Sequence, residues 1–149
     1  WTLAAVEILR MRFNPEASRQ MTARAATDAW TKPMAYLEAE PCGQGDKEAR
    51  KRLRVSHVYP NAAAVACGMR IRPGRPVPMT SVAHRCFQKL GGTGIIPSDT
   101  QIKLESDESL SDWICSEGIR HQAHTIHVCT EARYEQEQVR VYAFLSGAC

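Results

Sequence analysis

Two strand-like runs near the end of the chain constrain its fold most strongly. Residues 123–134 and 139–145 are separated only by Glu135-Gln136-Glu137-Gln138. Two strands joined by so short a connection pair as an antiparallel hairpin. The connection lacks the usual Gly or Asn, so the sequence leaves the register open. We therefore expect a sheet in the C-terminal half of the chain.

Alternation of apolar and polar residues predicts further short strands at 53–59, 69–72 and 101–105. A period of two residues is typical of a strand with one buried face. In the first of these strands, alternation places four residues on one face: Leu53, Val55, His57 and Tyr59.

Apolar residues dominate 1–13 and predict a mostly buried helix. Asn14-Pro15-Glu16 suits the start of a second helix that runs to about Lys32, where Pro33 ends it. Met34–Glu40 is interpreted as one further turn. The N-terminal 40 residues are thus expected to form a helical hairpin or small helical layer.

Three more helices are expected along the remainder of the chain. Asn61 is a suitable N-cap for a short helix over 62–67, and Thr80 or Ser81 for a helix over 82–90. Ser106 and Asp107 suit the first turn of a helix to about Glu117. The predicted fold class is α+β: an N-terminal helical hairpin, then a small mixed or antiparallel sheet over about 47–149 with two or three further helices.

Length and composition predict one domain. The 149 residues are 44% hydrophobic and 23% charged, which is ordinary for a globular protein. No apolar run approaches the roughly 20 residues that a membrane helix needs, so no membrane association is expected. Because Trp1 stands where an initiator Met would, we expect a processed product or a fragment, and the compartment stays unknown.

Charge is unevenly distributed. Residues 47–85 hold nine Lys or Arg and one Glu, whereas residues 99–149 hold four Lys or Arg and nine Asp or Glu. Of the 19 basic residues, 14 are Arg, whose planar guanidinium pairs with phosphate through two hydrogen bonds. We therefore expect nucleic-acid binding, with RNA favoured, through an Arg-rich band. Its predicted contact residues are Lys47, Arg50, Lys51, Arg52, Arg54, Arg70, Arg72 and Arg75.

The same charge pattern is compatible with a second function. The basic middle of the chain can pair with the acidic end of another copy, which would make this a structural or self-assembling protein. Few aromatic residues occur in the basic band, so a platform for base stacking is not predicted.

A metal site is the third hypothesis. Residues 113–129 hold three of the five histidines and two of the six cysteines. On an extended strand, His121, His127 and Cys129 share a face, and Cys115 from the preceding helix can approach them. Imidazole and thiolate ligands suit zinc, so we expect any metal at Cys115, His121, His127 and Cys129 to be zinc.

Cysteine chemistry offers an enzymatic alternative. A small cysteine hydrolase would pair Cys86 or Cys115 with one of the later histidines, because a neighbouring imidazole stabilises a thiolate. No local signature supports it, and the sequence names no catalytic residue. The six cysteines are expected to be reduced or metal-bound rather than bridged.

Overall fold

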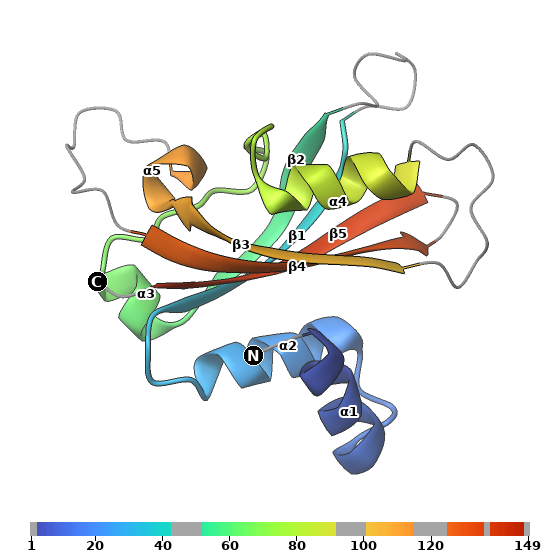
Figure 1. The fold of residues 1–149 in the computed structure, drawn as a ribbon. Helices are drawn as coiled ribbons and strands as arrows, with labels where there is room; N and C mark the ends of the chain where they lie inside the picture. The colour runs from blue at the N-terminus through green and yellow to red at the C-terminus, as the bar shows by residue number, and fades with distance from the viewer. Residues whose placement is uncertain (1–2, 43–51, 92–100, 115–124, 136–137, 148–149) are drawn as a thin grey trace.

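A computed structural model places a five-stranded antiparallel sheet at the centre of the protein, with helices on both faces (Figure 1). The structure describes residues 3–42, 52–91, 101–114, 125–135 and 138–147. The strand order is β2-β1-β5-β4-β3. Helices α1 and α2 cover one face, and α4 and α5 lie on the other. The fold is therefore α+β, as predicted.

The helices are α1 (Leu3–Phe13), α2 (Arg19–Asp28), α3 (Ala62–Ala66), α4 (Val82–Gly91) and α5 (Leu110–Trp113). The strands are β1 (Met34–Pro41), β2 (Leu53–Pro60), β3 (Gln101–Ser109), β4 (Thr125–Glu135) and β5 (Gln138–Gly147). The hairpin that was predicted near the end of the chain is β4–β5. In the described part of the chain, no helix has both the length and the apolar character needed to cross a membrane.

Helix starts follow the local capping residues. Asn61 caps α3 as predicted, because its side-chain Oδ1 accepts a hydrogen bond from the amide of Ala64 at 2.8 Å. Helix α2, however, begins later than Asn14-Pro15-Glu16 suggested. Its cap is Ser18, whose hydroxyl accepts from the amide of Met21 at 3.1 Å.

The main correction concerns residues 29–40, which are not part of a helical layer. Helix α2 ends at Asp28, and Met34–Pro41 forms β1, which pairs with β2 on one side and β5 on the other. Residues 34–39 are all buried, because the cluster under α1 and α2 covers one face of this inner strand and the larger cluster covers the other. A strand buried on both faces shows no alternation, so its sequence did not mark it as a strand.

Two smaller predictions were also wrong. Helix α1 is not mostly buried: Ile8 and Phe13 are 66% and 72% exposed, and only the first half of the helix reaches the sheet. The expected helix from Ser106 to about Glu117 is shorter, because β3 continues to Ser109 and α5 covers only four residues.

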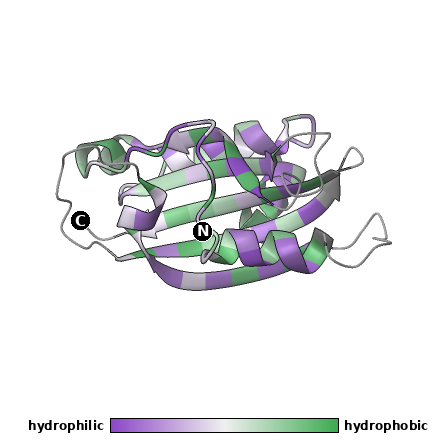
Figure 2. Ribbon diagram, turned by 90° about the horizontal axis from the view of Figure 1, so that it is seen from above, coloured by the Kyte–Doolittle hydropathy of each residue, from purple (hydrophilic) through white to green (hydrophobic). Residues whose placement is uncertain are grey.

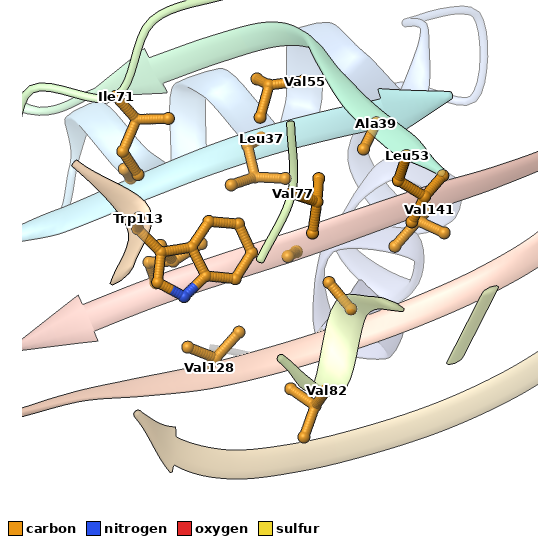
Figure 3. Packing of buried hydrophobic residues seen from close by; sticks show 14 of the residues in the cluster. Leu37, Ala39, Leu53, Val55, Ile71, Val77, Val82, Trp113, Val128 and Val141 are labelled. Carbon is orange, nitrogen blue, oxygen red and sulfur yellow. The ribbon is translucent and has the colours of Figure 1, made fainter. Parts of the chain in front are cut away.

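The sheet separates two hydrophobic clusters. The larger one lies between the sheet and α4, α5 and the segment 69–77, with Leu37, Val128 and Trp113 among its members (Figure 3). The smaller lies under α1 and α2 and contains Tyr36 and Phe144. Coloured by hydropathy and seen from above, both strands and helices carry hydrophobic as well as hydrophilic residues (Figure 2).

Candidate functional site

Four arginines lie at β2 or in the segment that pairs with its outer edge, and we call them the basic edge: Arg52, Arg54, Arg72 and Arg75. All four side chains are exposed. The two halves of the basic edge are held together by backbone hydrogen bonds between β2 and the segment 72–77. Gly74 N donates to Val55 O at 2.7 Å, Val55 N to Arg75 O at 2.8 Å, and Val77 N to Leu53 O at 2.9 Å.

The loop that carries Arg72 and Arg75 depends on Gly74. This residue has a φ of 82°, in the left-handed region that glycine adopts without strain. The turn allows the Pro-rich segment to run back along β2, where Arg54 and Pro76 form an isolated bridge. The structure thus holds Arg72 and Arg75 in a surface loop that is hydrogen-bonded to β2.

Among the described residues, the basic edge has a single ion pair. The sequence has no Asp or Glu between residues 52 and 91. Within the described residues, the ion pair of the basic edge is that of Arg54 with Glu40 of β1, at 2.9 Å. The other three guanidinium groups have no recorded acidic partner in that part of the chain, so the basic edge carries a net positive charge.

A bulge in β2 corrects the predicted face of His57 and Tyr59. The register with β1 shifts between Glu38 and Ala39, so that His57 pairs with Glu38 while Val55 pairs with Ala39. One extra residue in a strand reverses the alternation beyond it. His57 and Tyr59 therefore lie on the α2 side of the sheet, away from the larger cluster that buries Val55.

On that side, β2 carries aromatic as well as basic groups. The rings of His57 and Tyr59 stack at a centroid distance of 6.4 Å, and the guanidinium of Arg24 lies 5.4 Å from the Tyr59 ring centroid. Sequence analysis missed His57 and Arg24, because the bulge and the approach of α2 are tertiary features.

The remaining predicted nucleic-acid contacts are placed only in part. Arg70 is exposed and follows the buried Met69 just after α3, as alternation predicted, although 69–72 is not a strand. Lys47, Arg50 and Lys51 lie outside the described residues.

Two of the four predicted zinc ligands lie on one face of β4. His127 and Cys129 point to the α1 side of the sheet, whereas Ile126 and Val128 are buried in the larger cluster. Cys115 and His121 lie outside the described residues, so the predicted four-ligand zinc site stays a prediction. The antiparallel neighbour β3 adds two carboxylates, Glu105 and Asp107, opposite Cys129 and His127.

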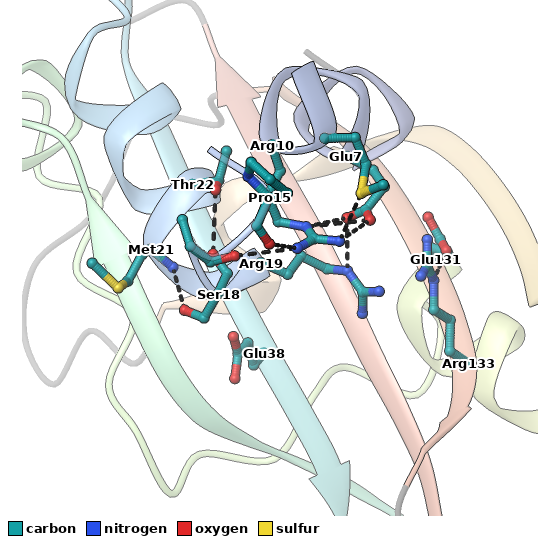
Figure 4. A network of polar contacts seen from close by, with 12 residues as sticks. Glu7, Arg10, Pro15, Ser18, Arg19, Met21, Thr22, Glu38, Glu131 and Arg133 are labelled. Atoms are coloured by element: carbon teal, nitrogen blue, oxygen red, sulfur yellow. Dashed lines mark hydrogen bonds and ion pairs between the residues drawn. The ribbon is translucent and has the colours of Figure 1, made fainter. Parts of the chain in front are cut away.

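Polar side chains also lie on this face of the sheet, where Figure 4 shows Glu38, Glu131 and Arg133 beside the contacts that Glu7 makes with Arg10 and Arg19. Glu131 of β4 is 1% exposed and forms an ion pair with Arg133. Nearby on β1, the phenol of Tyr36 donates to Glu38 Oε1 at 2.9 Å. Burial, reinforced by the charge of Glu38, raises the pKa of the Tyr36 phenol far above its ordinary value.

The described cysteines differ in their environments. Cys42, Cys86 and Cys129 are free thiols, whereas Cys67 is disulfide-bonded, which the sequence analysis did not expect. Cys86 lies in the larger cluster beside Thr130, on the face of β4 opposite to His127. Burial raises the pKa of the Cys86 thiol. The structure therefore does not bring Cys86 and His127 together.

Comparison with known proteins gives no further assignment: the chain matches no protein-family model and no curated protein.

Proposed function

We propose that the protein binds nucleic acid, with RNA favoured, through the basic edge. The observation that carries the proposal is the backbone pairing of β2 with the Gly74 loop. This pairing gathers arginines from two separate segments of the sequence into one exposed surface. A row of guanidinium groups attracts the phosphate backbone, and the counterions released on binding add a favourable, salt-dependent term.

His57 and Tyr59 extend the proposed surface onto the α2 side of the sheet. An exposed imidazole that is stacked on a tyrosine gives an unpaired base a ring to stack against. Such stacking is available to single strands and loops, whereas the bases of a regular duplex are already stacked. This feature favours single-stranded RNA over duplex.

The test is a salt titration of binding to a labelled single-stranded RNA, followed by fluorescence anisotropy. The variant Arg72→Glu/Arg75→Glu should bind at least about tenfold more weakly, and its plot of log affinity against log salt should be shallower by about two. The matched control is Arg85→Glu/Lys89→Glu. These two exposed residues lie on α4, which packs on β3, β4 and β5, and their reversal changes the charge equally.

Equal loss of affinity in both variants would show that only net charge matters, and it would reject the basic edge as the binding surface. Absence of RNA binding at low salt would reject the proposed function.

Self-association is the second candidate, because β2 and β3 are the two edge strands and differ in charge. Glu105 and Asp107 of β3 are exposed, with side chains 68% and 72% accessible. A basic edge of one copy can therefore face an acidic edge of another. Sedimentation at low and high salt tests this idea: a monomer at every salt concentration excludes it, whereas salt-sensitive oligomers that are lost in Arg72→Glu/Arg75→Glu support it.

A further inference from the structure

Antiparallel pairing of β3 with β4 gathers four potential metal-binding side chains, which we call the β3–β4 cluster: Glu105, Asp107, His127 and Cys129. Glu105 is directly opposite Cys129, and Asp107 is directly opposite His127. Residues i and i+2 of a strand point to the same face, and opposite residues have Cβ atoms about 5 Å apart. The strand register therefore places all four side chains close together on one face of the sheet, and no loop residue is needed.

Three donor atoms of the cluster lie within 4.8 Å of one another, one each from Glu105, His127 and Cys129. Cys129 Sγ is 3.4 Å from Glu105 Oε2, and His127 Nε2 is 3.7 Å from the same oxygen. In a tetrahedral zinc site, bond lengths of about 2.0 to 2.3 Å place neighbouring ligand atoms roughly 3.3 to 3.6 Å apart. These two distances thus lie within a few tenths of an ångström of that spacing, and the donor atoms of His127 and Cys129 are within 4.8 Å of each other.

Asp107 holds the imidazole in the orientation that a metal ligand needs. Its Oδ1 lies 2.9 Å from His127 Nδ1. In the tautomer with the proton on Nδ1, the Nδ1–H group donates a hydrogen bond to Asp107. Nε2 then keeps its lone pair and faces Glu105. Zinc-binding histidines commonly donate their other ring N–H to a carboxylate in this way, which fixes the tautomer and makes the ligand nitrogen more basic.

A cavity of about 500 Å³ opens beside the cluster and is lined by both Glu105 and Cys129. The buried Glu131 lines the same cavity, and its Oε2 has no hydrogen-bond partner among the described residues. A buried carboxylate oxygen without a partner is costly.

We propose that Glu105, His127 and Cys129 bind one Zn²⁺ per chain through Oε2, Nε2 and Sγ. Asp107 is a positioning residue for His127, and the cavity leaves a fourth position for water. A thiolate together with an imidazole favours zinc over magnesium or calcium, which prefer oxygen ligands alone. This zinc site uses two residues of the four-ligand set expected from the sequence and is independent of the nucleic-acid proposal.

The experiment is a titration of the 149-residue protein with Co²⁺ and Zn²⁺ under conditions that keep the Cys67 disulfide intact. Cobalt in a tetrahedral thiolate site gives a sulfur-to-metal charge-transfer band, and Zn²⁺ should displace it with one equivalent per chain. Cys129→Ser should abolish that band. Glu105→Gln should weaken Zn²⁺ binding measurably, and Asp107→Asn should weaken it about 10-fold to 100-fold while keeping the band.

Two controls remove the same chemical groups elsewhere. Cys42→Ser removes another free thiol, and His57→Gln removes another exposed histidine, whose Nδ1 lies 3.5 Å from Glu38. Both should bind Zn²⁺ as the unmodified protein does. Because Glu105 and Asp107 are exposed, their variants are expected to fold even if Cys129→Ser does not.

The proposal is overturned if the cobalt complex of the unmodified protein lacks the thiolate band. It is also overturned if Cys42→Ser loses that band, or if Glu105→Gln and Asp107→Asn bind Zn²⁺ with unchanged affinity.

Discussion

Met34 and Asn61 exchange two hydrogen bonds: Asn61 N donates to Met34 O at 2.9 Å, and Met34 N donates to Asn61 Oδ1 at 3.1 Å. The side-chain amide nitrogen of Asn61 also lies 2.8 Å from the carbonyl oxygens of both Trp30 and Lys32. This one buried side chain thus joins the link after α2, the start of β1 and the first turn of α3.

Asn61→Ala is therefore expected to destabilise the protein by about 2 to 4 kcal/mol, because it leaves several buried backbone groups without a partner. Urea unfolding measures the loss. Asn61→Asp is the informative companion, since it keeps the acceptor for Ala64 and Met34 but turns a carboxylate toward the carbonyls of 30 and 32. If Asn61→Asp were as stable as the unmodified protein, the amide donors would be unimportant.

Substitution of Gly74 should destabilise the loop that carries half of the basic edge. An added Cβ would meet no atom within 4 Å, so the cost of Gly74→Ala comes from its positive φ alone. We expect about 1 kcal/mol in urea unfolding, and less for Gly74→Asn, because Asn tolerates the left-handed region better than Ala. RNA affinity should fall in the same order. A Gly74→Ala variant of unchanged stability would contradict the left-handed turn.

The pH dependence of stability should report on Glu7. A hydrogen bond from Arg10 and its positive charge lower the pKa of the Glu7 carboxyl below 4.5. The folded state thus prefers the ionised form, so the contribution is complete above about pH 4.5 and disappears as the pH falls through the lowered value. Both side chains are partly exposed, and the expected effect is below about 1 kcal/mol.

Urea unfolding tests this expectation by comparing Glu7→Gln with the unmodified protein at several pH values. A range from about pH 3 to about pH 7 covers the titration of a glutamate. The difference between the two should be largest near neutral pH and should vanish in acid. A difference that grows as the pH falls would contradict it.

Cys86 should react with an alkylating agent only after the protein opens. Its thiol is buried and lies 3.2 Å from Thr130 Oγ1, and burial raises its pKa, so little thiolate is present at neutral pH. Mass spectrometry of protein labelled under native conditions should find Cys42 modified well before Cys86. Fast labelling of Cys86 in the folded protein would contradict its place in the core.

The sequence predicted those elements of the fold that are encoded within a short stretch of residues. The β4–β5 hairpin, helix α4 and the Asn61 cap follow from alternation, amphipathicity and capping. By contrast, β1 was missed because it is buried on both faces and lacks a periodic pattern.

For the candidate sites too, the sequence predicted what local alternation determines and missed what depends on strand pairing. Period-2 alternation placed His127 and Cys129 on one face, but Glu105 and Asp107 became their partners only through the register of β3 with β4. Register is a tertiary property that no short segment contains. The bulge opposite Glu38 and Ala39, which turns His57 toward α2, is of the same kind.

The position of β5 between β1 and β4 determines when the protein can fold during synthesis. Met34 is made early and its partner Ser146 is among the last residues of the sheet to leave the ribosome. Until then β1 and β4 each have an open row of backbone donors and acceptors, which favours pairing with other chains. Pairing over so long a stretch of sequence is also slow. A translation stop before residue 138 is thus expected to yield aggregates rather than a shortened but stable sheet.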